Sequence, residues 1–263
     1  MEVLTPRSLD EALRLKSERP DAVPIAGGTD VMVALNFDRL RPPALLNLNE
    51  VPELRGWTRD DGTLRLGAGL TYDDAMQGPL AELLPAFAEA SRTVGSPQIR
   101  NRGTIGGNLG TASPAGDGLP PLLVEGADVE LASTRGVRSM ALRDFLVGPK
   151  RNALEPDELV TAVVVRPSGA PQTFMKVGPR NAMVIAVVSL ALAADRDRAE
   201  LRASFGSAGP VPGFVTAPLG ERASFPELVA EAASPIDDVR GTAAYRRHAL
   251  RILCGRALDR CLA

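Results

Sequence analysis

Ala26-Gly27-Gly28-Thr29-Asp30 is the most informative stretch of this chain, and Thr104-Ile105-Gly106-Gly107-Asn108 repeats its central feature later. In both stretches, adjacent glycines stand between apolar residues and small polar ones. Backbone N–H groups there can approach an anion because no Cβ atom stands in the way. One glycine pair alone is more often a tight turn. Two pairs with these neighbours predict a ligand whose diphosphate is held from both sides.

The residues around the first stretch predict an anion-binding arrangement. Residues 22–26 form a short apolar run typical of a buried strand, and residues 29–36 predict a helix whose N-terminus faces the glycine turn. Unpaired N–H groups and the helix dipole then point the same way. Asp30 is also well placed to cap that helix. G-x-G-x-x-G is absent after any predicted strand and G-x-x-x-x-G-K-[ST] is absent altogether, so a nucleotide site here uses another architecture.

The rest of the chain predicts two α+β units. Turn residues cluster at residues 167–171, which places the boundary at residue 168, and the first unit divides again near residue 55. We expect domains 1–168 (subdomains about 1–55 and 56–168) and 169–263. The predicted helices are 8–19, one opened by Thr71, 80–92, one opened by a capping box at Ser224, and 242–262. The predicted strands are 44–48, 54–58, 63–67, 129–132, 137–140 and 159–165, then 172–177, 183–193 and 199–205 as an antiparallel meander, while residues 94–103 are expected to be loop.

Composition and charge exclude several classes of protein. The 263 residues carry a net charge of −2, which provides no electrostatic footprint for nucleic acid or for an anionic membrane. The longest apolar run, residues 183–194, is interrupted by Ser189 and is too short to span a bilayer. The first residues lack the basic and apolar regions of a signal peptide, so we expect a cytoplasmic protein.

The two cysteines and one histidine also limit the chemistry. Cys254 and Cys261 lie seven positions apart on the apolar stripe of the last predicted helix and are expected to be core thiols. His248 stands alone among arginines and is expected on the helix surface. No cluster provides the several ligands that zinc or iron–sulfur centres need. We therefore expect no metal site and assign no catalytic residue in this chain.

Polar residues beside the second glycine pair suggest how a ligand is held. Thr104 and Asn108 offer side-chain hydrogen bonds, and we expect the glycine N–H groups between them to be free. The stretch continues through Ala112-Ser113-Pro114 to Asp117. A carboxylate accepts hydrogen bonds from the hydroxyls of a ribityl or ribose group well, whereas it would repel a phosphate.

With these motifs the chain resembles the FAD-binding medium subunit of the molybdenum hydroxylases, the family of xanthine dehydrogenase, aldehyde oxidases and aerobic carbon-monoxide dehydrogenase. The matches follow the family's order over nearly the whole chain. Besides the two glycine stretches and the run to Asp117, they are Asp157-Glu158-Leu159-Val160, Phe174-Met175-Lys176 with Arg180, and Asp238-Val239-Arg240 with Tyr245-Arg246-Arg247. One departure is Phe205-Gly206-Ser207, because many relatives have a second adjacent glycine there.

The resemblance implies an α+β, FAD-binding fold of the vanillyl-alcohol-oxidase (PCMH) type with two α+β subdomains, followed by a small C-terminal domain of an antiparallel sheet and helices. It also implies noncovalent FAD. The implied FAD-binding residues are Pro24, Ile25, Ala26, Gly27, Gly28, Thr29, Asp30, Val31, Val94, Thr104, Ile105, Gly106, Gly107, Asn108, Ser113, Asp117, Val160 and Lys176. Lys176 could alternatively be a surface residue at a strand end.

The implied function is that of an FAD-binding subunit in a multi-subunit molybdenum hydroxylase. A large partner would carry molybdopterin, a small partner would carry [2Fe-2S] clusters, and the assembly would be a dimer of heterotrimers. FAD in this chain would receive electrons from the clusters and pass them to NAD, oxygen or a quinone. Two alternatives remain: a stand-alone flavin oxidoreductase of the same fold, and a flavin-free scaffold subunit.

Overall fold

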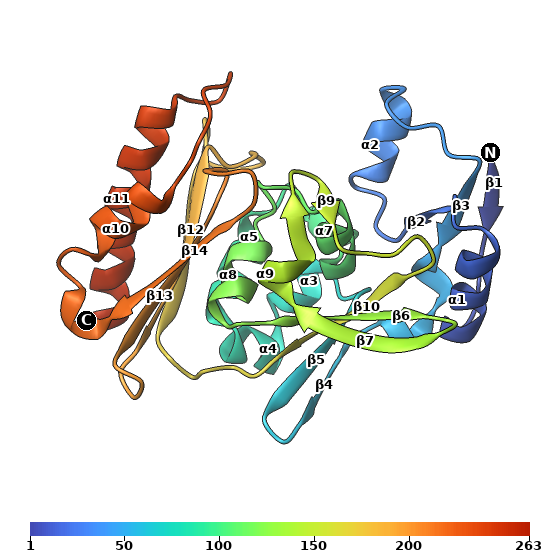
Figure 1. The fold of residues 1–263 in the computed structure, drawn as a ribbon, viewed down its shortest axis with the longest axis horizontal. Coiled ribbons are helices and arrows are strands. Elements are labelled where there is room, and N and C mark those ends of the chain that lie inside the picture. Colours follow the sequence, from blue (N-terminus) through green and yellow to red (C-terminus); the bar gives the residue numbers. More distant parts are fainter.

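A small parallel sheet forms the N-terminal end of the molecule. The computed structural model describes residues 1–263, and its sheets follow one another along the longest axis (Figure 1). The first sheet has the strand order β1-β3-β2. Its elements are β1 (Glu2–Leu4), α1 (Leu9–Glu18), β2 (Val23–Ile25), α2 (Val31–Asn36) and β3 (Ala44–Asn47), followed by the 3-10 turns η1 (Leu48–Glu50) and η2 (Pro52–Leu54). The predicted strand 22–26 and helix 8–19 are confirmed, and β2 ends directly before the first glycine stretch.

The middle of the molecule is a five-stranded antiparallel sheet with the order β4-β5-β10-β6-β7. Its strands are β4 (Trp57–Asp60), β5 (Thr63–Gly67), β6 (Asp128–Ser133), β7 (Gly136–Ala141) and β10 (Leu159–Val165). Both predicted hairpins are present. The turn between β4 and β5 places Asp61 at φ 43° and Gly62 at φ 74°, the left-handed conformation that an Asp-Gly hairpin turn requires.

Short helices cover this middle sheet and share its core. They are α3 (Tyr72–Ala75), α4 (Gly78–Leu83), α5 (Pro85–Thr93), α6 (Pro97–Arg100), α7 (Ile105–Thr111), α8 (Leu119–Val124) and α9 (Leu142–Phe145), with the two-stranded ribbon β8 (Leu146–Gly148) and β9 (Arg151–Asn152). The single helix predicted over residues 80–92 is wrong. Leu84 leaves the helical conformation before Pro85, because the residue before a proline is disfavoured in a helix.

The C-terminal part is the antiparallel meander expected from the sequence. Its strands pair in the order β11 (Gln172–Val177), β12 (Val188–Asp195), β13 (Glu200–Gly206) and β14 (Gly213–Pro218). Two details differ from the prediction. The second strand begins at Val188 rather than at residue 183, and β14 was not predicted because glycine and proline stand at its two ends. The helices α10 (Phe225–Ala232) and α11 (Ala243–Leu262) complete this part.

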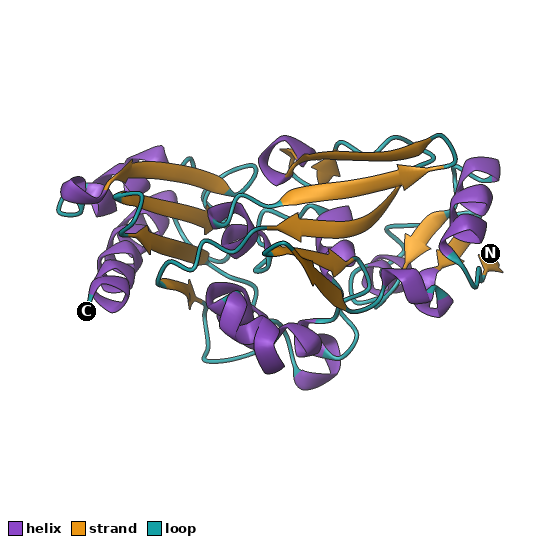
Figure 2. Cartoon of the chain, turned by 90° about the horizontal axis from the view of Figure 1, so that it is seen from below, coloured by secondary structure: helices purple, strands orange, loops and turns teal.

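Helices pack on both faces of the C-terminal sheet (Figures 1 and 2). Leu190, Leu192 and Phe205 belong to the core cluster shared with α10 and α11. Phe174 and Ala191, which are paired across β11 and β12, pack instead against Ala86, Ala90 and Val124 of α5 and α8. Lys176 lies two residues beyond Phe174 on β11 and therefore projects from the face that looks toward the middle of the molecule.

Candidate functional site

The first glycine stretch presents a run of free backbone donors. The chain leaves β2 at Ile25 and enters α2 at Val31, and Gly28 between them has φ 75°. The N–H groups of residues 27–31 donate to no group of the chain. Consecutive free N–H groups at a turn with a left-handed residue form a concavity that suits an anion. The prediction of an exposed donor set at this stretch agrees with this geometry.

The chain brings the two glycine stretches together. A Cβ atom on Gly27 would overlap the carbonyl oxygen of Arg102 and would lie 3.0 Å from the Cα atom of Gly103. At the other end of α7, the hydroxyl of Thr111 donates to Asp30 Oδ2 at 3.1 Å. Asp30 was expected to cap α2, but its side chain makes no capping hydrogen bond there. Its carboxylate instead accepts from α7.

The second glycine stretch is the first turn of helix α7 rather than an open loop. Thr104 is its N-cap, and its hydroxyl accepts from the Gly107 N–H at 3.0 Å. The Gly106 N–H donates to the carbonyl of Ala68 at 2.8 Å. The expectation that both glycine N–H groups are free is therefore wrong, since the cap and the neighbouring backbone use them. Gly107 itself is exposed, which leaves room beside the helix for a ligand.

The segment after α7 folds back onto the helix. Ala112 ends α7 at φ 45°. Beyond it, a Cβ atom on Gly116 would lie 2.6 Å from Asn108 Nδ2, and one on Gly118 would lie 2.9 Å from Asn108 Oδ1. The Ser113 hydroxyl accepts from the Ala115 N–H at 3.3 Å and shapes this loop. Asn108 is thus packed against the loop that carries Asp117.

A buried ion pair joins Asp117 to the C-terminal sheet. Lys176 Nζ on β11 lies 2.6 Å from Asp117 Oδ2, and the two side chains are 6% and 9% exposed. Lys176 also donates to the carbonyl of Thr93 at 3.0 Å. The alternative that Lys176 is a surface residue is excluded. Burial raises the pKa of Asp117 to about 6, and the adjacent Lys176 ammonium opposes that rise.

The ion pair leaves one carboxylate oxygen of Asp117 without a partner. Oδ2 is held by Lys176, whereas the buried Oδ1 atom accepts no hydrogen bond. A buried acceptor without a donor is costly. This atom fits the hydroxyl of a ribityl or ribose group, which would donate the missing hydrogen bond.

Val94 is half-buried in the loop after α5, whereas Val160 is buried in the core of the middle sheet. Val94 follows α5, and its backbone carbonyl accepts a hydrogen bond from Arg100 at 3.2 Å. Arg100 therefore holds together the loop between α5 and α6. Val160 is 8% exposed and belongs to the core cluster of the middle sheet. Strand β10, which carries Val160, packs against α7.

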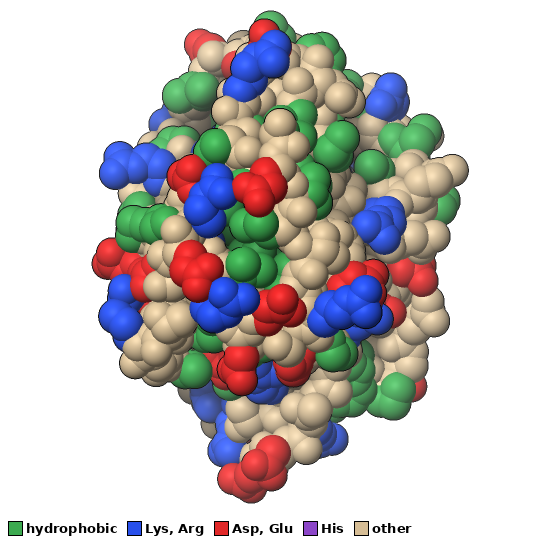
Figure 3. Space-filling view, turned by 90° about the vertical axis from the view of Figure 1, so that its right-hand side faces the viewer, with side chains coloured by type: hydrophobic (Ala, Val, Ile, Leu, Met, Phe, Trp, Pro, Cys, Tyr) green, Lys and Arg blue, Asp and Glu red, His purple; other side chains and the backbone are tan.

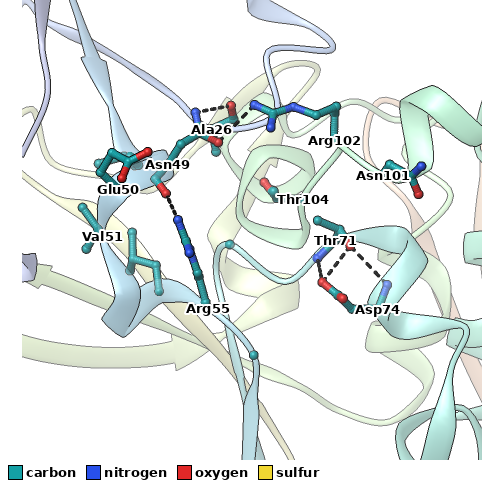
Figure 4. A pocket seen from close by; sticks show the side chains of 14 residues that line it. Ala26, Asn49, Glu50, Val51, Arg55, Thr71, Asp74, Asn101, Arg102 and Thr104 are labelled. Carbon is teal, nitrogen blue, oxygen red and sulfur yellow. Dashed lines mark hydrogen bonds between the residues drawn. The ribbon is translucent and has the colours of Figure 1, made fainter. Parts of the chain in front are cut away.

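A polar cavity of about 450 Å³ opens where the two glycine stretches meet (Figure 4). Ala26 and Thr104 line it from the two stretches. Arg102 donates to Asn49 Oδ1 at 3.2 Å, and the Asn49 amide donates to the Ala26 carbonyl at 2.9 Å. Asn49 and Arg55 were not identified from the sequence, because nothing near them resembles a motif. Their position depends on η1 and η2 folding beside the first stretch.

The donor set fits FAD. Five free N–H groups at residues 27–31 suit a diphosphate, and the unpartnered Asp117 oxygen suits a hydroxyl of the same ligand. The structure contains no group of three or more His, Cys, Asp or Glu side chains placed to bind a metal ion. No helix combines the length and apolar character needed to cross a bilayer. On the face drawn in Figure 3, positive and negative side chains lie side by side and no field of one sign develops.

Comparisons with known proteins agree with this geometry. The family model "FAD binding domain in molybdopterin dehydrogenase" matches residues 1–167. The chain is 37% identical over 206 residues to the nicotinate dehydrogenase FAD-subunit of Eubacterium barkeri, covering 75% of this chain and 70% of that protein. It is 33% identical over 213 residues to the xanthine dehydrogenase FAD-binding subunit of Escherichia coli O157:H7, covering 78% and 73%.

A solved structure matches the fold over the whole chain. A chain of the Cu,Mo-CO dehydrogenase in its cyanide-inactivated form aligns with a TM-score of 0.92 at 26% identity, covering 99% of this chain and 97% of that one. The fold expected from the sequence is therefore confirmed.

Proposed function

This chain belongs to the family of FAD-binding domains of molybdopterin dehydrogenases and is a flavoprotein component of an oxidoreductase; we propose that it links the iron–sulfur centres of a small partner subunit to an external electron acceptor. Bound FAD would supply the redox chemistry, taking electrons from those centres and passing them to NAD, oxygen or a quinone. A large molybdopterin-binding partner would oxidise the substrate. Two such heterotrimers would form the full assembly.

The first glycine stretch would hold the diphosphate of FAD. Its free N–H groups at residues 27–31 are fixed in one direction by the left-handed turn at Gly28. Oriented backbone donors stabilise an anion without moving, since the fold has already paid for their alignment. The first turn of α7, at Thr104, Ile105, Gly106, Gly107 and Asn108, would form the opposite wall. Its contribution would come from the exposed surface at Gly107 and from the packed Asn108, because its own N–H groups are engaged.

Asp117 and Lys176 would hold the other end of the ligand site. Asp117 Oδ1 would accept a hydrogen bond from a ribityl hydroxyl, while Lys176 keeps the carboxylate in place through Oδ2. The ammonium group is also a buried positive charge, and the part of its field that the Asp117 carboxylate does not offset would favour a reduced anionic flavin.

The observation that supports this function most strongly is the pairing of free donors at residues 27–31 with an unpartnered acceptor on Asp117, joined through α7. A scaffold subunit that binds no flavin would require neither the free donors nor the unpartnered acceptor. The relatives named above are FAD subunits of dehydrogenases, and this chain is expected to assemble with a large and a small partner.

Co-expression of this chain with its two partners tests the proposal. The three chains should co-purify, and the complex should reduce an external acceptor when its substrate is added. The isolated full-length chain should accept electrons from dithionite yet fail to oxidise purines, aldehydes or carbon monoxide. Substrate turnover by the isolated chain would favour the stand-alone flavin oxidoreductase. A chain that assembles with its partners but carries no flavin would favour the scaffold.

A further inference from the structure

Tyr72 packs between Gly103, which precedes the second glycine stretch, and Gly118, which follows Asp117. It follows the N-cap Thr71, which forms a β-bridge with Thr104, and its N–H donates to the carbonyl of Gly103 at 3.1 Å. A Cβ atom on Gly103 would lie 3.1 Å from the Tyr72 ring, and one on Gly118 would lie 3.6 Å from it. The ring is therefore held between the residue before Thr104 and the residue after Asp117.

The hydroxyl oxygen of Tyr72 is less enclosed than its ring and has no hydrogen-bond partner in the chain. The residue is 7% exposed, yet its hydroxyl makes no hydrogen bond with the chain and is not among the unpartnered polar atoms sealed from solvent. The ring is packed while the oxygen reaches an accessible space. A buried tyrosine hydroxyl usually finds a partner, so this one is directed at something the chain itself does not provide.

The charged groups near the Tyr72 hydroxyl determine whether it donates or accepts a hydrogen bond. Burial and the nearby carboxylates of Asp117 and Asp30 raise the pKa of Tyr72, so the phenol stays protonated wherever the protein is folded. Both neighbouring carboxylates are acceptors. A neutral hydroxyl near two acceptors, with no hydrogen bond to either, keeps its proton free to donate. Its place is fixed by packing: the ring lies against Gly103, which itself lies against Gly27 of the first glycine stretch, and against Gly118, which follows Asp117.

We propose that the Tyr72 hydroxyl is a hydrogen-bond donor to the ribityl-phosphate segment of the flavin nucleotide, between the diphosphate at residues 27–31 and the hydroxyl held by Asp117. The proposal rests on the FAD-binding function given above and adds a residue to that site. Tyr72 positions the cofactor and takes no part in electron transfer. It selects for the flavin half of FAD, because a ligand that has only the adenosine half does not reach this hydroxyl.

Titrations of the apo full-length chain with FAD, FMN and ADP test this assignment. Tyr72→Phe keeps the packed ring and removes only the oxygen. It should weaken the binding of FAD and of FMN about tenfold, the expected effect of one lost hydrogen bond, and leave ADP binding unchanged. The thermal midpoint of the apo protein should stay the same. Tyr245→Phe is the matched control, because Tyr245 is the other tyrosine of the chain and is 48% exposed on α11.

The outcomes separate this proposal from the function on which it rests. If Tyr72→Phe binds FAD within twofold of the unaltered chain, or weakens ADP as much as FAD, Tyr72 is not a donor to the ribityl-phosphate segment. A lower thermal midpoint of the apo variant with unchanged FAD affinity would show a purely structural tyrosine and overturn the proposal. If the unaltered chain binds neither FAD nor FMN, the FAD-binding function itself is wrong.

Discussion

Lys176 Nζ lies 2.6 Å from Asp117 Oδ2, and this ion pair connects the C-terminal sheet to the loop that follows α7. The two residues are 59 positions apart in the sequence, and both side chains are more than nine-tenths buried. The C-terminal sheet therefore contributes a charged side chain to a site whose other members belong to the first 168 residues. Removing either partner should alter both stability and cofactor binding.

The first prediction concerns the pH dependence of stability. The pKa of Asp117 is raised from 3.8 to about 6. A carboxyl that binds its proton more tightly in the folded state stabilises the fold fully below its unfolded pKa, and that contribution is lost as the pH rises through about 6. Asp117→Asn should therefore reduce the fall in thermal midpoint between about pH 5 and about pH 7.5. Asp197→Asn, at an exposed position between β12 and β13, is the control and should leave the profile unchanged.

Lys176→Met should have the opposite effect on that profile. It leaves Asp117 buried without its cation, which should cost about 3 kcal/mol of unfolding free energy at neutral pH. The loss should shrink at acid pH, where the carboxyl takes up a proton. Urea unfolding of Lys176→Met and of the unaltered chain, at about pH 5 and at about pH 7.5, measures this loss of unfolding free energy. An equal loss at both would mean that Lys176 stabilises the fold only by packing.

Replacing Gly107 with valine should abolish FAD binding while leaving a folded protein. Gly107 is exposed in the first turn of α7 and does not have a positive φ, so the reason is steric: a branched side chain would occupy the surface proposed to face the ligand. Gly110→Val is the matched control, because Gly110 is also exposed on α7 with open space beside it. Both variants lose a similar amount of helix propensity, and Gly107→Val also brings a Cβ atom to 3.1 Å from the Thr104 hydroxyl, so its stability should be slightly lower. Circular dichroism and flavin content should separate them, and stoichiometric FAD in Gly107→Val would exclude this wall of the site.

Gly27→Ala should disrupt the contact between the two glycine stretches. The added methyl group would overlap the carbonyl oxygen of Arg102, which is backbone and can move only with the loop. We expect a loss of about 2 kcal/mol or more of stability together with weaker FAD binding. Gly220→Ala, where nothing lies within 4 Å of the new atom, should be neutral in chemical denaturation. A neutral Gly27→Ala would mean that the two stretches are not held against each other.

The sequence predicted local structure better than contacts. The two hairpins, the meander and the last helix follow from alternation, turn residues and apolar spacing. The glycine pairs identified both halves of the site, but the second proved to be a capped helix whose donors are used. The Lys176–Asp117 pair and the position of Tyr72 depend on how β11 and α3 pack, and no local pattern encodes that. Ser207, which departs from the expected second glycine, adopts φ 60°, and its carbonyl accepts from the buried Arg246.

The flavin should be released completely by acid. Covalent attachment would need His248, Cys254 or Cys261, and all three lie on α11. His248 is exposed on that helix, while burial raises the pKa of Cys254 to about 12 and that of Cys261 to about 11, so both thiols are unreactive. Acid precipitation should leave a colourless pellet, and a thiol reagent should react only after unfolding. Flavin that stays with the precipitated protein would contradict this.

Isothermal titration of FAD into the apo full-length chain tests the central claim most directly. The free donors at residues 27–31 and the unpartnered oxygen of Asp117 together predict one noncovalent site. We expect one FAD bound per chain, with ADP and FMN each binding more weakly because each fills only part of the site. No measurable binding of FAD, or equal binding of FMN and FAD, would contradict the account.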